Sequence, residues 1–421
     1  MNVQFENSLE FAKSLDRQDE LAEYRSRFFF PVIKGKSQIY FTGNSLGLQP
    51  VATESYIEQE LNDWKEFGVE GHFHAKNPWY SYHELLRDAS AELVGAKPSE
   101  VVIMNSLTTN LHLLMVSFYR PTKQRYKIIC EYGAFPSDNY ALQSQAQFHG
   151  FDADDAIVIV KPKVGTHVIA HEDVLKAIEE NKDSLALVMM GGVNYYNGQV
   201  FNMSEITEAA HNVGAIAGFD LAHATGNIKM SLHDWNVDFA VWCSYKYLNA
   251  GPGSVAGAFV HEKHLCNKDL PRFAGWWGND PATRFQMADK FEPVAAADAW
   301  QLSNAPVLSM AALKASLDIF TTAGLEKLTI KSKLLTSYLE YVLKNVSDEI
   351  QIITPVERGC QLSVIIPRDG KRIHEYLTDN GVITDWREPD VLRLAPVPLY
   401  NSFEDVFKLG NVMKEAFAVT A

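Results

Sequence analysis

A lysine at the end of an apolar segment is the residue of this chain best placed for covalent chemistry. Lys246 ends a Ser-Tyr-Lys triplet that follows the apolar run 239–243, and a Gly/Pro-rich turn at 251–253 comes soon after. A lysine partly withdrawn from water presents a neutral amine, which can form a Schiff base with an aldehyde cofactor. The alternative is a solvated lysine at a strand end, since most lysines are exposed.

Asp220 is the second candidate, because its carboxylate ends the apolar run 215–219. A carboxylate buried at a strand end needs a cationic partner, and the protonated nitrogen of a pyridine ring would serve. The alternative is a helix N-cap, a position that aspartate also favours. His223, three residues further on, could orient this carboxylate or contact a ring, although a lone histidine more often only packs.

Two loops between strands and helices offer groups for a phosphate and for a flat ring. Thr108 lies in 106–110, where hydroxyls and N–H groups at a helix N-terminus would form an anion site or merely cap the helix. Phe135 could stack on a heteroaromatic ring or belong to the core, and Pro136 after it is also an ordinary helix start. Each loop therefore has a structural and a functional interpretation.

Arg393 is a cation within the otherwise apolar strand 391–395. If it is buried it needs an anion, and its planar fork best fits a carboxylate of a ligand or, alternatively, of an internal Asp or Glu. Tryptophans and asparagines lie close together at 275–279 and 300–304. These residues suit contact with a phosphate or an aromatic ligand, or a domain or subunit interface.

The elements that position these residues alternate between strand and helix. Strands are expected at 101–103, 126–130, 156–160, 185–190, 215–220, 239–244 and 256–260, and helices at 108–118, 136–149, 171–181 and 204–213. This alternation predicts a mostly parallel sheet covered on both faces. Ligands of such sheets gather at the carboxyl ends of the strands, where the candidate residues lie.

The flanking regions follow other patterns. Before the alternating region we expect helices at 8–28, 52–66 and 80–95 and a turn-rich loop at 43–50 after the strand 39–41. After residue 306 we expect helices at 307–320, 326–344 and 372–380 and strands at 349–353, 360–366 and 391–395. The predicted division is an N-terminal segment, 1–50, that contributes to the small domain, a large cofactor-binding domain, 51–305, and a small α+β domain, 306–421.

The composition limits the class of protein. A net charge of −14 over 421 residues repels phosphates and argues against nonspecific nucleic-acid binding. No apolar run is long enough for a membrane span, and the polar N-terminus does not read as a signal peptide. The four cysteines form no CxxC pair, so we expect no metal site, reduced thiols and a cytoplasmic protein.

Together these segments resemble the kynureninase family of pyridoxal-5′-phosphate enzymes, from about residue 38 to the C-terminus. The matching motifs are GNSLGL at 43–48, NSLTTNLHLL at 105–114, FPSD at 135–138, GFDLAHA at 218–224, the segment 242–251 and RLAPVPLYNSF at 393–403. The resemblance implies an α/β fold of fold type I, with a seven-stranded, mostly parallel sheet in the large domain. It also implies pyridoxal 5′-phosphate as cofactor and a homodimer with shared active sites.

The resemblance assigns a role to each candidate. The catalytic residues would be Lys246, which bonds to the cofactor and moves a proton, Asp220, which pairs with the pyridine nitrogen, and Tyr245, which delivers a proton. The cofactor residues would be Leu107, Thr108, Tyr245 and Trp276 at the phosphate, Asn304 at the phosphate from the neighbouring subunit, Phe135 stacked on the ring, Asp138 and His223 beside it, and Pro136 and Ser137 in the same loop. The substrate residues would be Arg393 at the α-carboxylate, and His72, Ser45 and Asn304 near the aromatic ring.

The implied reaction is hydrolysis of the Cβ–Cγ bond of L-kynurenine or 3-hydroxy-L-kynurenine to anthranilate or 3-hydroxyanthranilate and L-alanine, in tryptophan catabolism or NAD synthesis. The chain departs from the family pattern at Gly191, where a serine is expected, and at Asn279, where a histidine is common. One alternative is a cysteine desulfurase that uses Cys360 as its reactive thiol. Another is a binding protein on an inactive enzyme fold.

Overall fold

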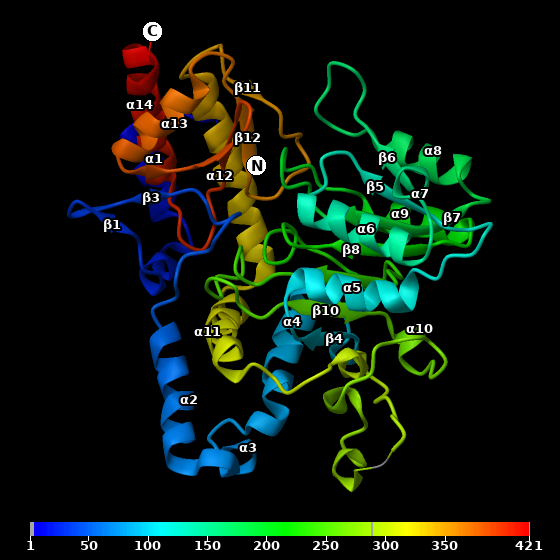
Figure 1. The fold of residues 1–421 in the computed structure, drawn as a ribbon. Coiled ribbons are helices and arrows are strands. Elements are labelled where there is room, and N and C mark those ends of the chain that lie inside the picture. The colour runs from blue at the N-terminus through cyan, green and yellow to red at the C-terminus, as the bar shows by residue number, and fades with distance from the viewer. Residues whose placement is uncertain (1–3, 288, 421) are drawn as a thin grey trace.

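The structure, a computed structural model, describes residues 4–287 and 289–420. Its largest unit is a seven-stranded sheet with the order β4-β10-β9-β8-β7-β5-β6 (Figure 1). The strands are β4 Val101–Ile103, β5 Lys127–Glu131, β6 Ile157–Val160, β7 Leu185–Gly191, β8 Ile216–Asp220, β9 Phe239–Trp242 and β10 Gly257–Val260. Strands β5 to β9 are parallel, and β10 is antiparallel to both its neighbours. The predicted mostly parallel sheet is confirmed.

Helices cover both faces of this sheet. The helices are α4 Arg87–Val94, α5 Leu107–Phe118, α6 Pro136–Phe148, α7 Ala153–Ala156, α8 His171–Glu180, α9 Met203–Asn212, α10 Glu262–Leu265 and α11 Val307–Ala323. In β7, Leu187 and Met189 pack into one core with α5 and α6, and Val188 and Met190 pack into the other core with α8, α9 and α11. Successive side chains of each strand point to opposite faces, and both faces are packed against helices. A ligand can therefore enter only at an edge of the sheet.

A second body contains a small antiparallel sheet and the two ends of the described chain (Figure 1). The sheet has the order β11-β12-β15-β14, formed by β11 Gln351–Ile352, β12 Leu362–Ile365, β14 Asp385–Arg387 and β15 Val391–Leu394. The helices around it are α1 Leu9–Arg17, α12 Leu325–Lys344, α13 Gly370–Asp379 and α14 Phe403–Thr420. Near the N-terminus, β3 Ile39–Tyr40 pairs in parallel with β13 Val382–Ile383, and β1 Val32–Ile33 pairs with β2 Lys36–Ser37.

Two predicted helices are broken in the structure. The expected helix 8–28 ends at Arg17, and a 3-10 helix, η1 Ala22–Arg27, follows, because the turn between them places Asp19 within 2.6 Å of the buried Lys331 ammonium. The expected helix 80–95 is divided into the 3-10 helix η3 Trp79–Leu86 and α4. Helix α14 has no counterpart among the predicted elements, and the Asp16 carboxylate accepts hydrogen bonds from its first N–H groups.

The packing of α11 bears on the predicted domain boundary at residue 306. Helix α11 packs with α2 Thr53–Phe67 in the core of the large body, and α3 Gly71–His74 lies at the far end of α2 (Figure 1). In α12, Leu328 belongs to the core of the large body and Leu335 to the core of the small one. The division into domains stays a prediction, and this packing favours a boundary within α12. Among the described residues, no helix is both long and apolar enough to cross a bilayer.

Candidate active site

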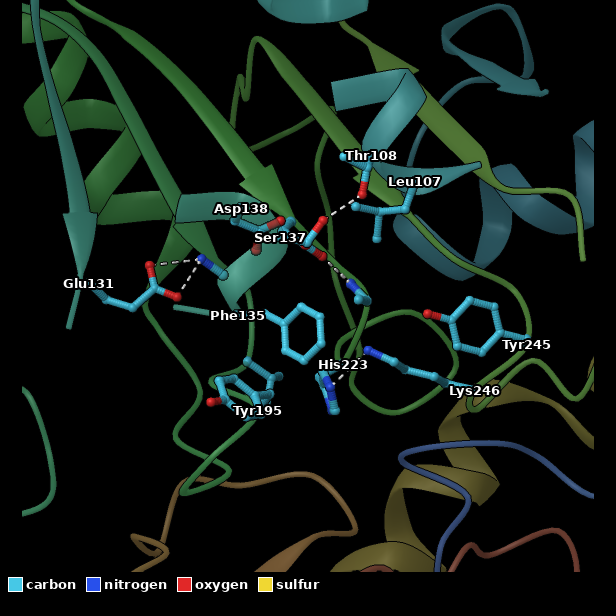
Figure 2. A pocket seen from close by; sticks show the side chains of 14 residues that line it. Leu107, Thr108, Glu131, Phe135, Ser137, Asp138, Tyr195, His223, Tyr245 and Lys246 are labelled. Atoms are coloured by element: carbon cyan, nitrogen blue, oxygen red, sulfur yellow. Dashed lines mark hydrogen bonds between the residues drawn. The ribbon is translucent and has the colours of Figure 1, made fainter. Parts of the chain in front are cut away.

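A cavity at the carboxyl edge of the large sheet gathers most of the predicted site residues (Figure 2). The residues that line it, here called the lysine cavity, are Leu107, Thr108, Glu131, Phe135, Ser137, Asp138, Gly191, Val193, Tyr195, Asp220, Ala222, His223, Tyr245 and Lys246. They come from the ends of β5, β7 and β8, from the segment after β9, and from the starts of α5 and α6. This is the edge at which parallel sheets bind ligands, as the sequence predicted.

Lys246 points into the cavity towards the residues predicted to hold the ring (Figure 2). Its Nζ lies 2.9 Å from Nε2 of His223 and 5.7 Å from the centroid of the Phe135 ring. Burial, followed by the positive charge of Lys246, lowers the pKa of His223 well below its ordinary value. The imidazole is therefore neutral and accepts a hydrogen bond from the lysine.

A glycine allows another part of the chain to support the lysine. The N–H of Gly47 donates to the carbonyl of Tyr245 over 2.8 Å, and an added Cβ at Gly47 would lie at 2.3 Å from the carbonyl oxygen of Lys246. Only glycine permits so close an approach of two backbones. The motif at 43–48 thus packs beneath the lysine, and Ser45 lies in this loop without lining the cavity.

Two carboxyl groups, those of Asp138 and Asp220, form a hydrogen-bonded pair within the cavity. Burial raises the pKa of both, and the neighbouring charge of Asp220 raises that of Asp138 further. The charge of Lys246 and the hydrogen bond from Asp138 both act to lower the pKa of Asp220. Asp138 is therefore the member that keeps a proton, and Asp220 carries the negative charge that a protonated ring nitrogen requires.

The helix-cap interpretation of Asp220 does not hold. The segment after it is a series of turns, and its Oδ1 accepts a hydrogen bond from the N–H of Ala222 over 2.6 Å. The same interpretation is not supported at α5, where the N-cap Ser106 makes no side-chain capping bond to the helix. The first N–H groups of α5 therefore remain available to an anion.

Hydroxyl groups from two helix starts meet at the other end of the cavity (Figure 2). Thr108 Oγ1 on α5 and Ser137 Oγ on α6 lie 2.7 Å apart. Pro136 occupies the first position of α6 and does not line the cavity. Two hydroxyls at the positive ends of two helices form a fitting site for a phosphate.

The lysine cavity fits pyridoxal 5′-phosphate by the chemistry of its donors. It offers an amine for the aldehyde, an aromatic face, a buried carboxylate and a phosphate site at the far end. Asp138 Oδ1 and His223 Nδ1 are buried and have no hydrogen-bond partner among the described residues. Buried polar atoms of this kind normally find a partner, which a bound ring with polar substituents would supply.

Glu131 is a cavity residue that the sequence analysis missed. Both of its carboxyl oxygens accept from the N–H of Gly191, over 3.1 and 3.2 Å, and burial raises its pKa to about 7. A Cβ on Gly191 would lie 3.0 Å from Glu131 Oε1, so the absence of a side chain there leaves room for the carboxyl group. The available signal was its position, because Glu131 ends β5 as Asp220 ends β8. Tyr195, after the end of β7, was missed likewise.

The Glu131→Gln variant should change how stability depends on pH. The folded protein keeps the Glu131 proton up to about pH 7, whereas an unfolded chain loses it near the ordinary glutamate pKa of about 4.3. This contribution is complete below about pH 4.3 and is lost as the pH rises through 7, a loss of at most about 4 kcal/mol. Urea unfolding of the cofactor-free protein should therefore show a smaller decline over this window in Glu131→Gln than in the unmodified protein or in a variant of the exposed Glu172.

Several predicted residues lie outside the cavity of their own chain. Trp276 is 44% exposed and donates its indole N–H to the carbonyl of Arg284, so within one chain the predicted phosphate contact is not made. His72 lies on α3 against Trp79, and Asn304 is exposed. Asn279, the second departure from the family pattern, donates to Thr283 Oγ1 and belongs to this outlying loop.

Fold and site together define a pyridoxal-5′-phosphate-dependent enzyme of fold type I. The structure is similar to a C-DES variant with glycine covalently linked to its PLP cofactor, with a TM-score of 0.75 and 17% identity over 89% of this chain and 96% of that chain. It is similar also to the cysteine desulfurase CsdA from Escherichia coli, with a TM-score of 0.78 and 16% identity over 96% of this chain and 99% of that chain. At such identities the likeness shows the fold alone.

Sequence comparisons identify the family. The family model of the kynureninase C-terminal domain matches residues 328–413. The chain is 57% identical to a kynureninase of Flavobacterium psychrophilum over 98% of both chains, and 53% identical to one of Myxococcus xanthus over 97% of both. It is 48% identical to a kynureninase of Nematostella vectensis, over 97% of this chain and 94% of the relative. This chain belongs to the kynureninase family, and its cofactor is pyridoxal 5′-phosphate.

The cysteine desulfurase alternative fails on the geometry of Cys360. Its side chain is 1% exposed, at the approach to β12, and burial raises the pKa of its thiol to about 12. A nucleophilic cysteine instead needs exposure and a lowered pKa. The binding-protein alternative is disfavoured because Lys246 and Asp220 are both present and are brought to one cavity.

Proposed function

We propose that this chain hydrolyses the Cβ–Cγ bond of L-kynurenine and 3-hydroxy-L-kynurenine, releasing L-alanine and anthranilate or 3-hydroxyanthranilate. Full-length relatives that are 48–57% identical are named kynureninases. The observation that carries the proposal is the arrangement of Lys246 Nζ beside a neutral His223 and the ring of Phe135, in a cavity shared with Asp220.

The cavity residues divide the chemistry among them. When bound, pyridoxal 5′-phosphate supplies an electron sink next to the carbon that carries the substrate's amino group. Lys246 Nζ is the base that takes the α-proton and later returns it. Asp220 would hold the ring nitrogen protonated. Burial raises the pKa of Tyr245, so this residue remains a protonated phenol. It can donate a proton to the substrate Cβ when the Cβ–Cγ bond breaks.

Other residues bind and orient. Phe135 would stack on the cofactor ring, and Thr108 and Ser137, whose hydroxyls meet at the helix starts, would hold its phosphate. Asp138 and His223 would contact the polar edge of the ring, and Arg393 would bind the substrate α-carboxylate. Ser45, on the loop beneath Lys246, and His72 and Asn304, from a neighbouring subunit, surround the aromatic ring of the substrate.

The activity is tested by adding L-kynurenine to the cofactor-loaded protein and following anthranilate fluorescence. Stoichiometric release of anthranilate and L-alanine is expected, and no sulfur release is expected from L-cysteine. Release of sulfur without anthranilate would instead assign the protein to the desulfurases.

We propose further that the active protein is a cytoplasmic homodimer. Phe285 contacts both Phe73 and Trp276, and all three are at least 44% exposed, which leaves an aromatic face on the isolated chain. Such a face favours contact with another protein surface. A second copy lying there would carry His72 and Trp276 towards the partner's cavity. Four free cysteines agree with a reducing compartment.

Subunit mixing tests whether the sites are shared. Lys246→Ala removes the amine, and Asn304→Asp would place a negative charge against the cofactor phosphate, so each variant alone should be inactive. In a mixed dimer one site carries both changes and the other carries neither. Random reassociation should therefore restore about a quarter of the unmodified activity. Mixed dimers that form but remain inactive would contradict the shared site.

A further inference from the structure

We propose that Asp385 is a positioning residue for the substrate, which orients the guanidinium of Arg393 towards the α-carboxylate, and that Arg387 keeps this cluster positively charged. The proposal rests on the function proposed above. It concerns three side chains on β14 and β15, which pair antiparallel with Asp385 directly opposite Arg393.

The contacts of Arg393 show that its direction is set by two anchors. Its Nη2 donates to the Asp385 carboxylate, and its Nη1 donates to the carbonyl of Tyr195 over 2.7 Å. Tyr195 lines the lysine cavity, and the guanidinium carbon lies 5.8 Å from the centroid of its ring. The guanidinium is therefore held next to Tyr195, a residue of the cavity wall, by the carboxylate of Asp385 and the carbonyl of Tyr195.

The Nε donor of this guanidinium remains unused within the described part of the chain. Arg393 is 1% exposed, and its Nε is buried with no hydrogen-bond partner among the described residues. A buried cation with a free N–H retains capacity for a further anion. The sequence offered two alternative partners for Arg393, an internal carboxylate and the carboxylate of a ligand. The same guanidinium can bind both at once.

The cluster of Asp385, Arg387 and Arg393 has two positive charges and one negative charge, so one further carboxylate would neutralise it. Arg387 Nη2 also donates to Asp385 Oδ2, over 3.1 Å, so two guanidinium groups share one carboxylate. The charges of Arg393 and Arg387 both contribute to the lowered pKa of the cavity residue His223, after burial and Lys246. The positive charges of the two arginines therefore act on the cavity. The single α-carboxylate of the substrate would neutralise the one positive charge that Asp385 leaves unpaired.

The experiment compares ligands that differ only in the carboxylate. L-Kynurenine is the substrate, and kynuramine, which lacks the α-carboxylate, is used as a competitive ligand. Asp385→Asn should raise the KM for L-kynurenine about ten- to a hundredfold and change kynuramine binding less than about twofold. The exposed Asp379→Asn, in the same body, is the matched control and should change neither.

A double variant separates positioning from simple structural support. If Asp385 acts through Arg393, adding Asp385→Asn to Arg393→Ala should raise the KM no further. A purely structural role predicts additive losses and equal weakening of both ligands, which would overturn the proposal. Retained cofactor absorbance and a cooperative thermal unfolding transition above the assay temperature show that each variant is folded.

Arg387→Gln provides a second test that leaves the Asp385–Arg393 pair in place. It should raise the KM for L-kynurenine about three- to tenfold and leave kynuramine unaffected, because only the surplus charge is removed. An unmodified protein that does not cleave L-kynurenine would refute the proposed function. Normal cleavage, with an effect of Arg393→Ala but none of Asp385→Asn or Arg387→Gln, would refute this inference alone.

Discussion

Replacing Lys246 with alanine is expected to lower turnover of L-kynurenine by at least about a thousandfold, because the variant lacks both the nucleophile that bonds to the cofactor and the base that moves the α-proton. The cofactor should still bind without a covalent bond, since Phe135, Thr108 and Ser137 keep their places. Steady-state anthranilate release and the visible spectrum of the dialysed protein measure the two effects separately.

A matched control and a chemical label complete this test. Lys229→Ala removes an exposed lysine from the turn region after Asp220 and should leave turnover unchanged. Borohydride should attach the cofactor to the unmodified protein at position 246 and should fail to do so in Lys246→Ala. Near-normal steady-state activity in Lys246→Ala would show that another residue performs the chemistry.

Replacing Arg393 with alanine is expected to raise the KM for L-kynurenine by about a hundredfold. Truncating one member of a buried, hydrogen-bonded charge pair costs about 2–5 kcal/mol, and here the group left without a partner would be the substrate carboxylate. Initial rates over a wide range of substrate concentration measure the change.

The effect of Arg393→Ala has to be separated from a loss of folding, because Asp385 would lose its cross-strand partner. Arg393→Lys keeps the charge but lacks the planar fork, so its KM should fall between those of the unmodified protein and Arg393→Ala. An unchanged KM in both variants would mean that the α-carboxylate is held elsewhere.

Much of the fold was predictable because its sequence patterns are local. Apolar runs bounded by turns predicted the seven strands of the large sheet, and periodicity of three to four predicted its main helices. The antiparallel direction of β10 was not predictable, because a strand pattern is the same in either direction. Helix α1 was overextended because the ion pair between Asp19 and Lys331, more than 300 positions apart, decides where the chain turns.

The sequence by itself determined which groups could do the chemistry. Lys246, Asp220 and Thr108 stand at ends of strands or starts of helices, and parallel connections bring those ends to one edge of a sheet. Their neighbours along the chain, which form the family motifs, carried the same information.

Only the tertiary structure decided how these groups are paired and charged. The contact between Glu131 and Gly191, the proton kept by Asp138, and the two anchors of Arg393 join segments that are distant in sequence. Burial and the charges of neighbouring residues set these states, and both depend on the folded arrangement of the whole chain.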